Sequence, residues 1–180
     1  VGTWFIDEFT NIQRKEQRTM WYSIIQEREI GFYGRISPKI KIVLAGNAPE
    51  HSADAQEISS SLANRVNFIE VSPPTVDEWG KWMHKTYGDK WDTRTLAYLH
   101  LFPQDLFKMP DREEVLHNYP TPRSWTLTAT MMYEELVVDK EKLDSEWVRE
   151  RIVGYLGGEV GGKFYSFLKV KVFTLSLIHI

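Results

Sequence analysis

Two adjacent carboxylates follow an apolar stretch near the start of the chain. Trp4, Phe5 and Ile6 lead directly into Asp7 and Glu8. One acid of such a pair can hold Mg²⁺, directly or through a water, while its neighbour acts on an attacking water. Because ligands of open α/β sheets collect at the carboxyl ends of the strands, the pair predicts a catalytic edge. A helix N-terminus that favours negative charge would also explain the pair, and this alternative stays open.

Three further polar residues have types and positions that would complete a hydrolytic site. Asn47 follows a second apolar run, residues 40–45, and its amide can orient a water or contact a phosphate oxygen. An Asn that only serves a turn is the alternative. Arg65 stands at the start of a third run, residues 66–71, and Arg123 stands in the first turn of a predicted helix. A cation there opposes the helix macrodipole, which indicates an anion close to Arg123.

The composition excludes other kinds of chemistry. The 180 residues contain no Cys, which excludes disulfides, thiolate metal sites and thiol nucleophiles. The five His lack metal-ligand spacing, which argues against a zinc hydrolase. A net charge of −3 gives no overall electrostatic drive toward nucleic acid. No apolar run reaches the roughly 20 residues of a membrane span, so we expect a cytoplasmic protein without a membrane partner.

The elements that must position these residues divide into two regions. Residues 1–72 alternate apolar runs with helical patterns, which predicts an α/β fold. The runs 3–6 and 40–45 predict parallel strands covered on both faces, and 66–71 predicts an edge strand. The double proline at positions 73 and 74 marks the boundary to a helical subdomain, residues 73–169.

Local signals locate the helices. The first region carries a capping-box spacing from Thr10 to Gln13, a glycine-punctuated hairpin or insertion over residues 30–36 and a short helix before Arg65. The second region carries helix starts at Thr75 and Thr121 and a helix end at Gly157. Helical spacing of the seven Trp predicts that most belong to the core.

Both ends of the chain differ from those expected of a complete protein. Val1 opens directly on an apolar run, so we expect an N-terminally truncated fragment. Residues 170–180 form a tail, and residues 175–180 match the translation of a transposon-end sequencing adapter, which we exclude from the fold as an artefact. A genuine apolar strand over 170–180 is the alternative.

The order of these residues resembles that of AAA+ ATPases, and specifically of the bacterial and phage MoxR-like branch, from Gly2 to Leu136. By this resemblance, Asp7 and Glu8 match the Walker B motif, with Asp7 toward Mg²⁺ and Glu8 activating water. Asn47 matches sensor 1, and Arg65 matches the arginine finger that acts on ATP held by a neighbouring subunit. Arg123 matches sensor 2 of the lid and would contact the γ-phosphate. The expected fold is a partial P-loop NTPase sheet followed by an all-helical lid.

One motif departs from the family pattern. The phosphate-binding loop belongs upstream of Walker B, where the 180 residues hold no such loop. Residues 157–163 fit Gly-x-x-x-x-Gly-Lys, but Phe164 replaces the Ser or Thr that binds Mg²⁺, and the string lies after Walker B. We interpret it as a glycine-broken link between two lid helices, and we expect the chain as given to bind ATP weakly.

The resemblance implies a Mg²⁺-dependent ATPase that assembles as a hexameric ring and remodels a protein client. Two alternatives stay open. A nucleic-acid motor on the same core would use the insertion, where Arg28, Arg35, Lys39 and Lys41 surround Phe32 and Tyr33. We favour a solvated hairpin there. The other alternative is a non-catalytic interaction domain.

Overall fold

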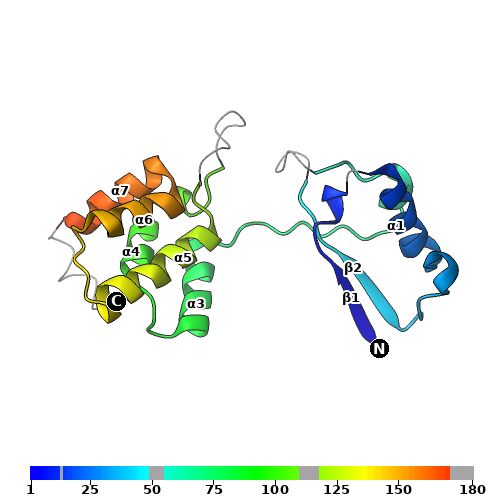
Figure 1. Cartoon of the computed structure of the whole chain (residues 1–180), viewed down its shortest axis with the longest axis horizontal. Helices are drawn as coiled ribbons and strands as arrows, with labels where there is room; N and C mark the ends of the chain where they lie inside the picture. The colour runs from blue at the N-terminus through cyan, green and yellow to red at the C-terminus, as the bar shows by residue number, and fades with distance from the viewer. Residues whose placement is uncertain (13, 49–54, 110–117, 171–180) are drawn as a thin grey trace. The chain divides into compact units, whose positions relative to one another are not determined.

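The computed structural model describes residues 1–12, 14–48, 55–109 and 118–170, and the chain divides into two units, residues 1–70 and 71–180 (Figure 1). The unit boundary falls two residues before the position that the double proline indicates. The predicted tail lies outside the described residues beyond Val170. Within the described ranges, no helix has the length and apolar character of a membrane-crossing segment.

The first unit is built on a parallel two-stranded sheet. Strand β1 (Gly2–Ile6) pairs with β2 (Ile40–Leu44), in a register that aligns Ile6 with Leu44. Helix α1 (Lys15–Glu27) connects the two strands and packs along the sheet through Trp4 and Trp21, whose ring centroids lie 5.8 Å apart (Figure 1). Parallel strands joined by a helix confirm the mixed α/β character predicted for this region.

Three expectations for the first unit are wrong. Only one sheet face is covered within the described part of this unit, because Phe5 and Val43 are 59% and 41% exposed. Residues 66–71 form no strand, and the side chains of Phe68 and Ile69 are exposed, because no described strand lies beside them to complete their backbone hydrogen bonds. Helix α1 begins at Lys15 and not at Thr10, because a 3₁₀ turn, η1 (Phe9–Asn11), takes the earlier residues.

The insertion between α1 and β2 is a short, tight hairpin. A one-turn 3₁₀ segment, η2 (Gly31–Tyr33), forms its tip, and an antiparallel bridge joins Glu29 to Arg35. This agrees with the prediction from the paired glycines. The short helix α2 (Ser60–Ala63) also forms where it was predicted, with the Ser59 hydroxyl accepting from the Leu62 backbone N–H.

Helices are the regular secondary structure found among the described residues of the second unit. Its first and third long helices begin at the predicted N-caps, Thr75 and Thr121. Thr75 forms the predicted capping box with Glu78, and Thr121 forms one with Ser124, which the sequence analysis did not predict. The hydrogen bonds that Thr75 donates to Glu78 lower the pKa of that carboxyl. The elements are α3 (Val76–Tyr87), α4 (Arg94–Leu101), η3 (Pro103–Leu106), α5 (Pro122–Tyr133), the π-helical segment η5 (Glu134–Val138), α6 (Glu146–Leu156) and α7 (Gly158–Lys169).

An aromatic cluster around Tyr98 forms the centre of this unit. The Tyr98 ring packs against Trp125 and Phe164, at centroid distances of 5.5 and 5.1 Å. Its hydroxyl donates to the buried Asp105 carboxylate at 2.6 Å, and the Trp125 indole N–H donates to the Asp105 carbonyl at 2.7 Å. Burial and the neighbouring Asp105 raise the pKa of Tyr98. The buried hydroxyl of Tyr98 and the buried indole N–H of Trp125 therefore both have hydrogen-bond partners within the core.

The tryptophans divide between core and surface. Trp79, Trp91 and Trp125 are 2% exposed or less, whereas Trp82 and Trp147 are 47% and 58% exposed. The prediction that most of them form core is thus only partly confirmed, because helical spacing alone does not show how wide the covered face of a helix is.

Helix packing explains most of the Gly-x-x-x-x-Gly-Lys string. Gly157 ends α6 with a left-handed φ of 78°, and α7 begins at the next residue, so the break between the helices is a single residue. Gly161 lies where α7 meets α6, since a Cβ there would approach the Val153 Cα to 2.8 Å. Lys163 donates to Glu159, which Lys108 also contacts, and together the two lysines lower the pKa of Glu159 to about 2. The string therefore serves the helical unit, as the sequence interpretation proposed.

This packing predicts that alanine substitutions at two neighbouring glycines have different effects on the free energy of unfolding. We expect Gly161→Ala to lower the free energy of unfolding by about 1–3 kcal/mol, because the backbone of α6 must move to admit the methyl group. Gly162→Ala is the matched control, since a Cβ there meets nothing within 4 Å. It should leave stability unchanged or raise it by about 0.5–1 kcal/mol through helix propensity. Urea unfolding followed by circular dichroism measures both, and equal effects would contradict the proposed close approach.

Candidate functional site

Backbone hydrogen bonds join the carboxyl ends of β1 and β2. The Ala45 N–H donates to the Ile6 carbonyl at 2.9 Å, and the Phe9 N–H donates to the Ala45 carbonyl at 2.8 Å. Phe9 is only 6% exposed and anchors the turn that follows β1. Asp7 and Glu8 lie between these two bonds, so their backbone is held at the edge of the sheet that the sequence predicted.

Local hydrogen bonds orient the two carboxylates. Asp7 Oδ1 accepts from the Glu8 backbone N–H at 2.9 Å, and Glu8 Oε2 accepts from the Asn11 side-chain amide at 2.8 Å. Both acids are exposed. Glu8 has a φ of 52°, in the left-handed region, where a residue with a side chain costs about 1–3 kcal/mol. Such outliers concentrate at functional positions, and sequence patterns carried no signal for this one.

Asn47 follows β2 at the same edge. It comes three residues after Leu44, the register partner of Ile6, and its side chain is exposed. The structure thus brings the strand ends that carry Asp7, Glu8 and Asn47 side by side. Among the described residues, the hydrogen bonds of the two carboxylates stay within residues 7–11 and none reaches Asn47.

A close contact that the sequence did not reveal determines the path toward Asn47. Gly46 passes against Thr10, and a Cβ at Gly46 would lie 2.5 Å from Thr10 Oγ1 and 2.9 Å from its Cγ2. The Thr10 hydroxyl and Asn11 Oδ1 are buried without a hydrogen-bond partner in the described structure. Glycine is therefore required at position 46 because a Cβ would clash with the Thr10 side chain, and not because of its backbone dihedral angles.

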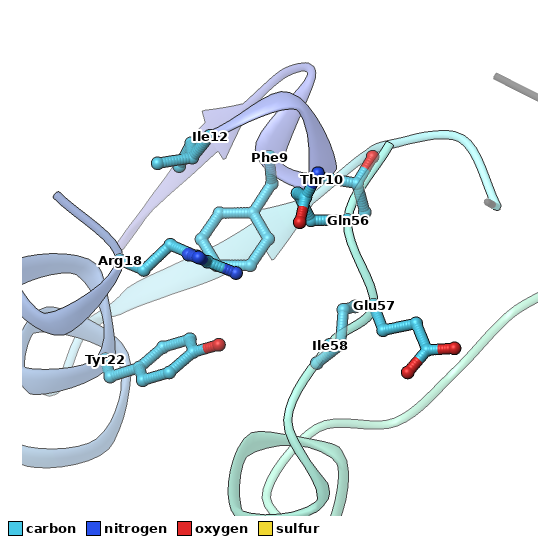
Figure 2. Close-up of a pocket in the computed structure, with 8 residues that line it drawn as sticks. All are labelled: Phe9, Thr10, Ile12, Arg18, Tyr22, Gln56, Glu57 and Ile58. Atoms are coloured by element: carbon cyan, nitrogen blue, oxygen red, sulfur yellow. The ribbon is translucent and has the colours of Figure 1, made fainter. Parts of the chain in front are cut away.

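A small cavity lies behind this turn. Figure 2 shows the Phe9 ring beside Thr10, with Arg18 and Tyr22 of α1 across from Gln56, Glu57 and Ile58. The cavity holds about 10 Å³, roughly the room of one water, so a nucleotide cannot enter it. A large ligand of this unit would therefore have to bind outside this cavity.

The two predicted arginines lie in different units. Arg65 follows α2, is exposed, and donates through Nη1 to the Ser61 carbonyl at 2.6 Å and to the Ser61 hydroxyl at 2.9 Å. Arg123 is exposed in the first turn of α5, next to the Thr121 cap. Within the described residues of the first unit, the hydrogen bonds of Arg65 go to Ser61 and not to Asp7 or Glu8, and the roles of both arginines stay predictions.

The donor set at the strand edge is compatible with Mg²⁺. Mg²⁺ binds oxygen ligands and is usually held by one or two carboxylates together with substrate phosphates and waters. Asp7 is exposed, and its hydrogen bond with the Glu8 N–H uses Oδ1. Within the described part of the chain, no group of three or more His, Asp or Glu forms a ready metal cage. Waters or oxygen atoms of a bound substrate would have to complete the coordination of an ion held there.

Comparison with known proteins adds no identification. No protein-family model, curated protein sequence or solved structure matches the chain significantly.

The Gly46–Thr10 contact predicts a coupled pair of variants. We expect Gly46→Ala to lower the free energy of unfolding by about 1–3 kcal/mol, because a methyl group overlaps the Thr10 side chain. Adding Thr10→Ala removes the two nearest atoms and should restore most of that loss. Gly2→Ala, where a Cβ meets nothing within 4 Å, is the control on the same sheet. A double variant as unstable as Gly46→Ala alone would show that the contact does not limit this turn.

Proposed function

We propose that the chain is part of a Mg²⁺-dependent ATPase of the AAA+, MoxR-like type, with its hydrolytic residues at the carboxyl edge of β1 and β2. The observation that carries the proposal is the parallel pairing of these strands, with Asp7 and Glu8 after one and Asn47 after the other. Open α/β sheets bind their ligands at this edge. The agreement in order with the family's motifs supports the same assignment.

In this proposal the three residues divide the chemistry. Asp7 holds Mg²⁺, which would neutralise charge on the phosphates. Glu8 accepts a proton from the attacking water, and its contact with the Asn11 amide orients the carboxylate before substrate arrives. Asn47 offers an exposed amide that can orient the water or contact a phosphate oxygen.

The proposal extends to assembly. Arg65 would act on ATP bound by a neighbouring subunit, and its hydrogen bonds to Ser61 are exposed and therefore cost little to exchange. Arg123, exposed in the first turn of α5, would contact the γ-phosphate. Arginine that neutralises transition-state charge from a neighbouring chain is an established device in phosphoryl transfer. A ring, with six subunits as the family resemblance implies, would use this arrangement to remodel a protein client.

The Walker B assignment predicts separate effects on binding and turnover. The 180 residues hold no Gly-x-x-x-x-Gly-Lys-Ser/Thr loop, and the proposal expects one upstream, so the test uses the full-length gene product. Glu8→Gln should reduce hydrolysis about 10²–10⁴-fold and leave ATP bound, because it removes the base and keeps the shape. Glu16→Gln, an exposed acid on α1, is the control. Phosphate release and labelled-ATP binding measure the two effects, and unchanged hydrolysis in Glu8→Gln would reject the assignment.

The Arg65 assignment predicts complementation between subunits. Arg65→Ala should lose activity in a uniform ring. Mixing it with Glu8→Gln subunits should restore part of the activity, since some interfaces then join an intact Arg65 to an intact Glu8. The measurement is ATP turnover across mixing ratios, and Arg149→Ala, exposed on α6, serves as control. A mixture as inactive as its components would show that Arg65 does not act across subunits.

A further inference from the structure

Residues 29–35 form a loop, here called the aromatic loop, that presents two adjacent aromatic side chains to solvent. Phe32 is fully exposed and Tyr33 is 91% exposed. These exposed fractions are far higher than those of the other large aromatic side chains in the described part of the chain. The exposure of two neighbouring rings leaves their apolar faces without a partner. This feature goes beyond the proposed hydrolytic residues, which lie at the other end of β2.

The aromatic loop is held in place by its own backbone. The Ile30 N–H donates to the Gly34 carbonyl at 3.0 Å, and the Tyr33 N–H donates to the Ile30 carbonyl at 2.8 Å. Gly31 and Gly34 have φ values of 44° and 109°, which favour glycine. Two rings held outward by an ordered turn lose little conformational entropy when they bind a partner.

The chain around the aromatic loop is basic although the protein is acidic overall. Residues 28–41 contain four cations and one carboxylate, in a chain of net charge −3. The carboxylate, Glu29, is already paired with Arg35 Nε at 2.8 Å. The Arg28 guanidinium donates to the Ile40 carbonyl, which places the base of the loop next to Lys39 and Lys41. Both lysines are exposed.

We propose that the aromatic loop and the two lysines bind single-stranded nucleic acid. Phe32 and Tyr33 would stack on successive bases, and Arg35, Lys39 and Lys41 would contact phosphates. Aromatic platforms beside cations are the combination with which proteins bind single strands without sequence preference. An apolar peptide would gain nothing from the cations, so the local charge favours a polyanion. Binding requires no nucleotide hydrolysis, so this proposal stands or falls independently of the Walker B assignment.

Fluorescence anisotropy of a labelled 20-nucleotide oligothymidylate with the full 180-residue chain, without ATP, tests the stacking. We expect Phe32→Ala/Tyr33→Ala to weaken binding by about tenfold or more, because each base loses its aromatic partner. Phe68→Ala removes another exposed ring of the same unit and should leave the affinity unchanged. Circular dichroism confirms that the variants fold. An oligonucleotide that does not bind, or that binds the double variant equally well, overturns the proposal.

The salt dependence tests the phosphate contacts. Lys39→Ala should reduce the slope of log K against log salt by about 0.7, the value for one phosphate contact on a single strand. Lys85→Ala, exposed on α3, should leave the slope unchanged. Phosphatidylserine vesicles and a polyglutamate peptide serve as alternative ligands. If either binds the loop as tightly as the oligonucleotide does, and loses that binding in Phe32→Ala/Tyr33→Ala, the specific proposal of a nucleic-acid partner is wrong.

Discussion

The backbone bonds at the end of the β1–β2 ladder determine where the side chains of the candidate site lie. Ala45 is bonded on one side to Ile6 and on the other to Phe9, so the chain leaves β1 and turns while both strand ends stay joined. A shift of the β1–β2 register by one residue would turn the Trp4 side chain to the other face of the sheet. Trp4 would then lose its contact with Trp21 and become exposed. Hydrophobic burial against α1, and not an attraction among the polar residues, therefore sets the position of Asp7 and Glu8.

Elements whose signals are local could be predicted from the sequence. The helix N-caps at Thr75 and Thr121 form where the sequence predicts them, because the capping hydroxyl and the backbone N–H that it accepts from lie within three residues of each other. Residues 66–71 have a strand-like composition but form no strand, because a strand needs a neighbour to bond its backbone. The spacing from Thr10 also failed as a helix start, since a tight turn anchored by the buried Phe9 takes those residues.

The candidate site was predictable in outline and not in detail. Two apolar runs that each end in polar residues predict a shared edge, and the parallel register agrees. The left-handed Glu8 and the Gly46–Thr10 contact depend on how the turn packs, which no spacing rule contains. The glycines at positions 157 and 161 show that a sequence pattern can also suggest a site that the fold does not form. A string that matches a phosphate-binding pattern is accounted for by a helix end and a helix crossing, so the position of a motif in the fold decides its meaning.

The energetics of Glu8 bear on why a carboxylate stands there. Its left-handed backbone costs about 1–3 kcal/mol relative to an ordinary conformation, whereas glycine adopts this φ without that cost. The only side-chain bond that Glu8 makes among the described residues is an exposed one to Asn11, and a typical hydrogen bond contributes about 0.5–1.5 kcal/mol. Folding alone therefore gives Glu8 little advantage over glycine. The proposed role of the Glu8 carboxylate toward a bound substrate would account for an acid at this strained position on the exposed edge of a parallel sheet.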